Sequence, residues 1–487
     1  MKRSIAFLLA LLSVCTHTAA CGESTAPIDT TADTSCSQTA EITDYRSNFP
    51  SNLDFGGESV HIFGWEGTSG VEFTVEEQDG EIVNDAIYNR NATVENHLNV
   101  ELEFTLIPGN YSNYTSWLTT VRSMILAGDG SIDIIGAYTG CAAILASEKL
   151  LLDLNELPYF NFDQQWWSQS LVNESSVENK LYFASGDIST NLIHSMFCVF
   201  FNKDFVDSYN LENPYDLVRS GKWTIDKMSE MTKTLYADLN GNGTNDLDDQ
   251  YGFITRNVTN DSFFYAAGLR TTTINSSGIS ELAFDSQGER IHALLDKLIT
   301  CFNDPCWLQL DDGKLADLNR IFTEGRALFL SSEVLVATTD LRYSDIDYGV
   351  LPIPKYDETV ENYETCTKHT FSLYGIPVDA PNAEMSAAVL ECFAIEGYYN
   401  VSPALFETAL KVKYASDDDA SEMYDIIRNN CVFDFGRIFG LSLNHLTYNT
   451  FRNCVANGNS DWFSAYDTKK VRLEEQFDAL ISTLMEE

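Results

Sequence analysis

The segment from residue 60 to residue 139 alternates between short apolar runs and amphipathic helical patterns, and this order constrains the fold more than any other feature. In the helical stretches, apolar residues recur at three- and four-residue spacing, whereas the runs between them are short or alternate with polar residues. The predicted order is a strand at 60–63, a helix at 83–98, a strand at 100–106, a helix at 117–125 and a strand at 132–135. Such an alternation predicts an α/β lobe with a largely parallel sheet.

The rest of the body carries enough further elements for a second lobe. Strands are predicted at 196–201, 348–354 and 371–378, and the segment 322–330 is predicted as a helix end that turns into a strand. Helices are predicted after Thr224, at 383–398 and at the C-terminus. The last helix places the apolar residues Leu473, Phe477, Leu480, Ile481 and Leu484 on one face. A chain of 487 residues is long for one domain and sufficient for two lobes with their own cores.

The N-terminus resembles a bacterial lipoprotein signal. A positively charged start precedes an apolar stretch at 5–14, which is shorter than the roughly 20 apolar residues of a membrane-spanning helix. Small residues then lead to Cys21, so we expect residues 1–20 to be removed and Cys21 to carry the lipid. The match departs from the usual pattern at Thr18, where leucine is common, and the alternative is an ordinary signal peptide with Cys21 incidental.

Residues 21–44 are rich in Ser, Thr, Ala and Asp and poor in large apolar residues. This composition predicts a flexible tether between the anchor and the body. We therefore expect the protein to be held by its lipid at the outer face of the bacterial cytoplasmic membrane.

The charge balance excludes one large class of partners. The chain has 30 basic and 72 acidic residues, which gives a net charge of −42. Such a surface repels nucleic acid and anionic lipid headgroups, so neither is expected as a partner. The same field favours a neutral or cationic ligand over an anionic one, unless local geometry compensates.

Four stretches of the body resemble segments of the family 1 extracellular solute-binding proteins of bacterial ABC importers, the group that includes the maltose-type sugar binders. They are the helix-stop-strand unit at 127–135, the crossing strand at 200–203, the Phe-x-x-Gly-x-Ala segment at 322–330 and the Leu-Pro-x-Pro strand at 348–355. Their order, combined with the lipoprotein signal, extends the resemblance over roughly residues 55–487.

The resemblance implies a type II periplasmic-binding-protein-like fold, in which two α/β lobes, each a mostly parallel sheet flanked by helices, are joined by a hinge. By the family pattern, the N-lobe takes residues 45–190 plus 365–403, and the C-lobe takes residues 191–364 plus 404–487. The resemblance also implies a monomeric, non-enzymatic protein. It would capture a small solute, with an oligosaccharide favoured, and pass it to the membrane subunits of an ABC transporter.

Candidate ligand residues follow from the rule that ligands lie beyond the carboxyl ends of parallel strands. An aromatic ring at such a strand end suits the apolar face of a sugar, and a carboxylate accepts hydrogen bonds from neighbouring hydroxyls. The candidates are Trp65, Glu66, Tyr138, Asp187, Trp307 and Glu333. For each, the alternative is a packed core ring or a surface acid.

The segment 238–249 matches a calcium-binding loop. Oxygen-bearing side chains stand at loop positions 1, 3, 5, 9 and 12, a glycine at position 6 permits the sharp turn, and position 7 offers its carbonyl. The ligands would be Asp238, Asn240, Asn242, Thr244, Asp246 and Asp249. The segment departs from the usual calcium-loop pattern at position 12, where Asp249 replaces the longer glutamate. The alternative to a calcium-binding loop is a polar turn. We expect a structural Ca²⁺.

Two other classes of function stay open at this point. A surface-anchored glycoside hydrolase would use a pair of carboxylates, but the sequence has no Gly-x-Ser-x-Gly elbow and no His-Glu-x-x-His motif. A calcium-dependent adhesin would explain the tether and the calcium loop, but not a large hinged α/β body. Cys301 and Cys306 are close enough in sequence to bridge, although the scattered cysteines do not form a disulfide framework.

Overall fold

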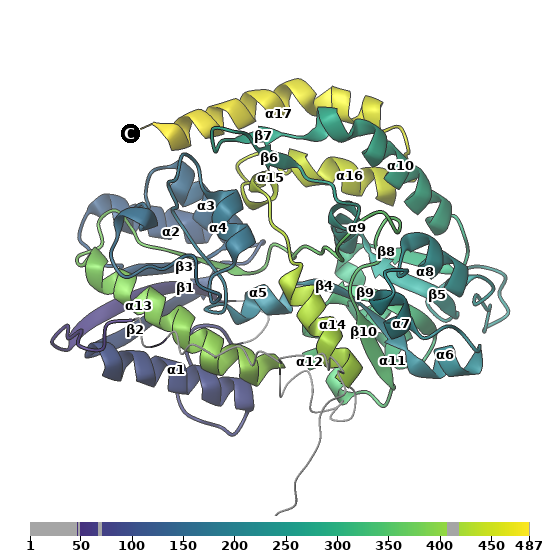
Figure 1. The fold of residues 1–487 in the computed structure, drawn as a ribbon, viewed down its shortest axis with the longest axis horizontal. Coiled ribbons are helices and arrows are strands. Elements are labelled where there is room, and N and C mark those ends of the chain that lie inside the picture. Colours follow the sequence, from purple (N-terminus) through teal and green to yellow (C-terminus); the bar gives the residue numbers. More distant parts are fainter. Residues whose placement is uncertain (1–45, 47–48, 67–70, 407–417, 487) are drawn as a thin grey trace, which may run out of the picture. The chain divides into compact units, whose positions relative to one another are not determined.

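Two β-sheets, each with helices on both sides, organise the chain (Figure 1). The structure is a computed structural model of the chain and describes residues 46, 49–66, 71–406 and 418–486. These described residues belong to one compact unit. The predicted signal peptide, the tether and Cys21 lie outside the described residues.

The first sheet has the strand order β11-β3-β1-β2. Its strands are β1 (Glu58–Glu66), β2 (Val100–Pro108), β3 (Ile134–Tyr138) and β11 (Ser372–Gly375). β1 pairs in parallel with β2 and β3, because a helix separates each strand from the next: α1 (Ile82–Leu98) and then α2 (Tyr114–Ala127). β11 returns from far along the chain and pairs antiparallel to β3. The predicted strand-helix alternation is therefore confirmed.

The second sheet has the strand order β10-β4-β9-β5-β8. Its strands are β4 (Phe197–Asn202), β5 (Tyr251–Arg256), β8 (Trp307–Leu310), β9 (Ala327–Glu333) and β10 (Tyr348–Leu351). β5 is parallel to β8 and β9, whereas β4 is antiparallel to β9 and β10. The α/β class holds for both sheets, and this second one is evenly mixed. The residue boundaries of the two lobes stay a prediction.

The longer helices cover these sheets and connect them. They are α8 (Ile225–Thr232), α10 (Phe284–Phe302), α11 (Leu315–Thr323), α13 (Ala383–Glu396), α14 (Asp418–Asn429), α16 (Leu446–Ala456) and α17 (Trp462–Met485). The Thr224 side chain caps α8 by accepting from the Lys227 amide, as its position before the helix predicts. The apolar face predicted for the last helix is buried in α17.

Segments that connect the two sheets run side by side. Met196 pairs antiparallel with Thr367, and the Lys368 amide donates to the Ser195 carbonyl at 2.7 Å. A further segment joins them where Thr365 pairs in parallel with Cys431. In the described ranges, no helix combines the length and the apolar character that crossing a bilayer requires. Cys301 and Cys306 are buried free thiols.

Candidate ligand-binding site

A cavity of about 500 Å³ lies where the carboxyl ends of strands from both sheets meet. Its volume falls within the range of small-molecule sites, about 300–1,000 Å³. The lining comes from the ends of β2 and β3, the ends of β5 and β8, the crossing segment 368–370, and α16 with the residue that precedes it. Because parallel strands that share a sheet end at the same edge, the fold itself brings these positions together.

The first sheet contributes aromatic and amide side chains. Tyr138 is the last residue of β3, is 3% exposed, and packs edge-on against Trp65 with ring centroids 5.8 Å apart. The turn after β2 is fixed by Asn110, whose Oδ1 accepts from the Ser112 amide at 3.1 Å. This turn leaves the ring of Tyr111 59% exposed at the cavity.

The second sheet contributes a buried ion pair. Arg256 ends β5 and Glu333 ends β9, and the parallel pairing of these strands places both residues at one edge. Arg256 Nη2 donates to Glu333 Oε1 at 2.6 Å. Burial alone would raise the pKa of Glu333, but Arg256 and Lys368 outweigh burial and hold that pKa at about 2. Asp312, just beyond β8, accepts from the Val258 amide at 2.7 Å.

The crossing segment supplies Lys368 and His369. Lys368 Nζ lies 3.2 Å from Glu333 Oε1, and about a third of its side chain is exposed. The His369 ring packs against Tyr448 with centroids 4.7 Å apart, and its Nε2 has no hydrogen-bond partner among the described residues. Burial, followed by the nearby charges of Arg437 and Arg452, lowers the pKa of His369 well below its ordinary value, so the imidazole is neutral.

The last part of the lining is one face of α16. The lining residues recur here at the three- and four-residue spacing of neighbours on a helix surface: His445, which directly precedes α16, and Tyr448, Asn449 and Arg452 within it. Arg452 Nε donates to Asp261 Oδ1 at 3.0 Å, and Arg437 Nη1 donates to Asp261 Oδ2 at 2.6 Å. Burial would raise the pKa of Asp261, but the two guanidinium groups lower it below its usual value.

Two of the predicted aromatic residues lie in the cores. Trp65 is 1% exposed, and its indole Nε1 donates to Ser372 Oγ at 3.0 Å. Trp307 is 5% exposed and packs against Phe253, with centroids 4.4 Å apart. Neither indole lines the cavity, because both are packed in the apolar core.

The predicted acids divide among different places. Glu66 is exposed at the end of β1 and does not line the cavity. Asp187 is buried, pairs with Arg428 and Ser402, and lines a separate cavity of about 240 Å³. Glu333 lies directly behind the cavity-lining Arg256 and Lys368. Of the six predicted ligand residues, Tyr138 alone belongs to the cavity lining.

Sequence reasoning missed most of the lining. The turn at 110–112 follows a strand that was predicted, so the strand-end rule that selected Tyr138 also applied to Tyr111. Arg256 ends a strand that the pattern did not single out. For Lys368 and Arg452 the sequence offers no signal, because chain crossings and helix packing bring them to the cavity.

The segment 238–249 forms a loop directly before β5 of the second sheet, outside the cavity lining. The amide groups of Asn240 and Asn242 both donate to the Asp246 carboxylate, and the Gly243 amide donates to Asp238 Oδ2 at 2.8 Å. Gly243 has a φ of 75°, which glycine adopts without strain. Asp249 is buried and accepts from the Tyr236 hydroxyl at 3.0 Å.

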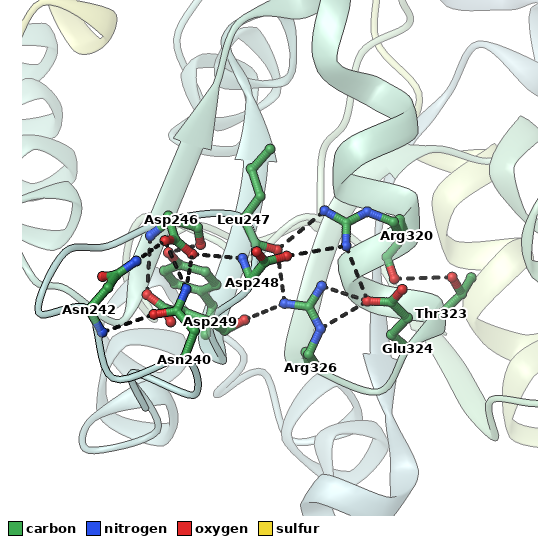
Figure 2. A network of polar contacts seen from close by, with 11 residues as sticks. Asn240, Asn242, Asp246, Leu247, Asp248, Asp249, Arg320, Thr323, Glu324 and Arg326 are labelled. Atoms are coloured by element: carbon green, nitrogen blue, oxygen red, sulfur yellow. Dashed lines mark hydrogen bonds and ion pairs between the residues drawn. The ribbon is translucent and has the colours of Figure 1, made fainter.

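Two arginines, one on α11 and one directly before β9, attach this loop to that helix and strand (Figure 2). Arg326 Nη1 donates to the carbonyls of Leu247 and Asp249, at 3.0 and 2.6 Å. Arg320 reaches the Leu247 carbonyl at 3.4 Å. The loop has the oxygen-rich composition that Ca²⁺ prefers. The two asparagine amides direct their nitrogens at Asp246, and rotating each amide would present its oxygen in place of its nitrogen. Within the described ranges, no group of three or more His, Cys, Asp or Glu side chains is spaced to hold a metal ion.

Comparison with known proteins gives matches in structure. No protein-family model matches the sequence, and no curated protein matches it. The ABC substrate-binding protein Lmo0181 from Listeria monocytogenes, solved in complex with cycloalternan, superimposes with a TM-score of 0.53. It is 16% identical, and the match covers 88% of this chain and 99% of that chain.

Two further solved structures match equally broadly. The GacH receptor of Streptomyces glaucescens GLA.O, solved unliganded and with acarbose, has a TM-score of 0.54 and 11% identity over 86% of this chain and 99% of that one. The maltose/maltodextrin-binding domain MalE from Bdellovibrio bacteriovorus, bound to maltotriose, has a TM-score of 0.52 and 11% identity over 86% and 100%. At these identities the likeness is one of fold. The chain therefore has the two-lobed α/β fold of the maltose-type substrate-binding proteins of ABC transporters.

Proposed function

We propose that this protein is a solute-binding protein that captures an oligosaccharide in the cavity between its two sheets and delivers it to an ABC transporter. The observation that carries the proposal is the cavity itself, to which the strand ends of both sheets contribute. Ligands of open α/β sheets lie beyond the carboxyl ends of strands. The matched structures with the same fold were solved with cycloalternan, acarbose and maltotriose.

The chemistry of the lining supports a saccharide ligand. The exposed ring of Tyr111 offers apolar surface and a hydroxyl group together, and the largely buried rings of Tyr138 and Tyr448 complete the aromatic part of the lining. The Asn449 side chain adds an amide that both donates and accepts hydrogen bonds. A sugar presents the complementary combination of an apolar ring face and a rim of hydroxyls.

The carboxylates near the cavity support binding without turnover. Glycoside hydrolysis ordinarily needs two carboxyl groups across the scissile bond, one of them protonated near neutral pH. Asp312 is the acidic residue of the lining, and it is engaged by the Val258 amide. Glu333 lies behind the lining with a pKa of about 2, so it holds no proton to donate at neutral pH.

Isothermal titration of the full chain against a panel of mono- and oligosaccharides tests this function, combined with chromatography of the recovered ligand. The proposal expects saturable binding of at least one oligosaccharide, recovered intact. Hydrolysed product would instead support the carbohydrate-active enzyme, and binding to large polymers or surfaces alone would support the adhesin. An absence of binding across the panel would overturn the saccharide proposal.

The proposal includes a lipid anchor at Cys21 and a location at the outer face of the bacterial cytoplasmic membrane. Support comes from the charged start, the apolar stretch and the small residues before Cys21. Incorporation of labelled palmitate into the chain, lost on Cys21→Ser, is the expected result. Equal labelling of both proteins would contradict the anchor.

We also propose that the loop 238–249 holds a structural Ca²⁺. Its support is the spacing of the oxygen-bearing side chains along the loop, together with the proximity of the Asn240 and Asn242 amide groups to the Asp246 carboxylate. Because the loop is attached through Arg326 to the start of β9, a bound ion would stabilise the second sheet.

A further inference from the structure

Two buried carboxylates near the cavity are each shared by two cations. Glu333 is paired with Arg256 and Lys368, and Asp261 is paired with Arg437 and Arg452. Both carboxylates are at most 4% exposed. With the pKa of each held down by its cations, each group of three side chains carries a net charge of +1.

The arrangement of these groups directs positive charge toward the cavity. Arg256, Lys368 and Arg452 line it, whereas Glu333 and Asp261 do not. The lining therefore has three cations against one acid, Asp312. This local balance reverses that of the whole chain, in which acidic residues outnumber basic residues by 72 to 30.

The lining cations retain donors that the protein does not use. Arg452 donates to Asp261 through Nε and Nη2, and within the described ranges its Nη1 makes no hydrogen bond. Lys368 has three N–H donors on Nζ and one carboxylate partner, Glu333. These donors suit an anion, since charge-assisted hydrogen bonds are about twice as strong as neutral ones.

The acidic surface does not cancel this local preference. At physiological ionic strength the Debye length is about 8 Å, so exposed charges farther away are largely screened. Charges that are buried beside the cavity are screened much less. The positively charged lining therefore compensates locally for the net charge of −42, so the cavity can bind an anionic ligand.

We propose that the ligand is an anionic oligosaccharide, with carboxylate or sulfate groups that Lys368 and Arg452 bind. This inference rests on the proposed function and specifies its ligand class. The tyrosines of the lining account for the sugar rings, and the two cations account for the acidic groups.

The test is isothermal titration of the full chain against two sets of anionic oligosaccharides. One set contains uronic acids, each paired with its carboxyl-reduced neutral counterpart, and the other contains sulfated oligosaccharides, each paired with its unsulfated neutral counterpart. The expected result is that an acidic or sulfated member binds at least about tenfold more tightly than its neutral counterpart, and that added salt weakens this binding. The two acidic sets distinguish a carboxylate from a sulfate.

Variants of Lys368 test the residue assignment. Lys368→Met should weaken binding of the acidic probe about tenfold more than binding of its neutral counterpart, whereas Lys368→Arg should retain the acidic preference. Lys470→Met is the matched control, because Lys470 is 31% exposed against 32% for Lys368 and also pairs with carboxylates. Neutral members that bind as tightly as acidic ones would overturn the inference and leave the proposed function standing. No binding by any member would overturn both.

Discussion

Arg256 and Glu333 end two neighbouring parallel strands, and the guanidinium of Arg256 lies 2.6 Å from the Glu333 carboxylate with both side chains at most 4% exposed. Glu333, one of the residues predicted to bind ligand, is the counter-ion of Arg256 and Lys368 in the structure. The Glu333 carboxylate forms ion pairs with both side chains. These ion pairs fix the positions of two cations that line the cavity. The relationship links the stability of the second sheet to the charge of the proposed binding site.

Glu333→Gln should destabilise the protein strongly. The substitution leaves Arg256 buried without its counter-ion, and breaking a buried ion pair costs about 3–5 kcal/mol of the free energy of unfolding. Chemical denaturation of the variant measures the loss. The control is Glu148→Gln, which breaks a pair with Arg122 that is about a third exposed and should cost at most about 1 kcal/mol. Equal effects of the two substitutions would contradict the role given to Glu333.

Glu391 should make the protein less stable as the pH rises from about 4.5 to 7. Burial raises its pKa from 4.5 to about 7, although the indoles of Trp166 and Trp167 donate to it at 2.9 Å. A carboxyl whose folded pKa is raised stabilises the fold below its unfolded pKa, and the contribution is lost as the pH rises through the folded value. The difference corresponds to about 3 kcal/mol.

Glu391→Gln should remove this part of the pH dependence, because the amide does not titrate. Denaturation at pH 5 and pH 8 provides the comparison. Glu384→Gln, on the exposed side of the same helix, should keep the dependence of the unsubstituted protein. An unchanged pH dependence in Glu391→Gln would show that another group is responsible.

Tyr111→Ala should weaken ligand binding with little effect on folding. The ring is 59% exposed at the cavity, so its removal deletes contact with a sugar without opening the core. Loss of one aromatic contact is expected to cost about 1 kcal/mol, or roughly fivefold in the dissociation constant. Tyr343→Ala is the control, since Tyr343 is 82% exposed and does not line the cavity. Titration calorimetry should separate the two variants.

Calcium should raise the melting temperature of the full chain by a few degrees. An ion that binds only the folded state, at a free concentration of about 100 times its dissociation constant, adds about 2.7 kcal/mol to the free energy of unfolding. Asp238→Asn, which neutralises the first position of the loop, should reduce the shift, whereas Asp204→Asn on α6 (Lys203–Ser208) should not. A protein whose melting temperature is the same with chelator and with excess Ca²⁺ would refute the calcium proposal.

Periodicity and element order carried the prediction of the fold. The alternation between residues 60 and 135 predicted the parallel core of the first sheet, and the spacing of Leu473, Phe477 and Leu484 predicted the buried face of α17. These signals are local, so one sequence contains them in full. The evenly mixed pairing of the second sheet depends on contacts between distant segments, which periodicity does not encode.

The site was predicted less well, for a physical reason that Trp65 illustrates. The strand-end rule led to the edge of the first sheet at which the cavity lies, but the Trp65 indole is buried and donates to Ser372 Oγ on β11. Tyr138, the last residue of β3, packs edge-on against Trp65 and lines the cavity instead. Arg452 reaches the same cavity from α16, whose position is set by packing rather than by any pattern near Trp65.

Hydrogen exchange of the full chain, with and without the tightest-binding oligosaccharide of the panel, tests the central claim most directly. If the ligand occupies the proposed cavity, amides at 110–112, 368–370 and 445–452 should become protected, because these segments supply its lining. Protection confined to other segments, such as those around Asp187 and Arg428 at the second cavity, would contradict the proposed site.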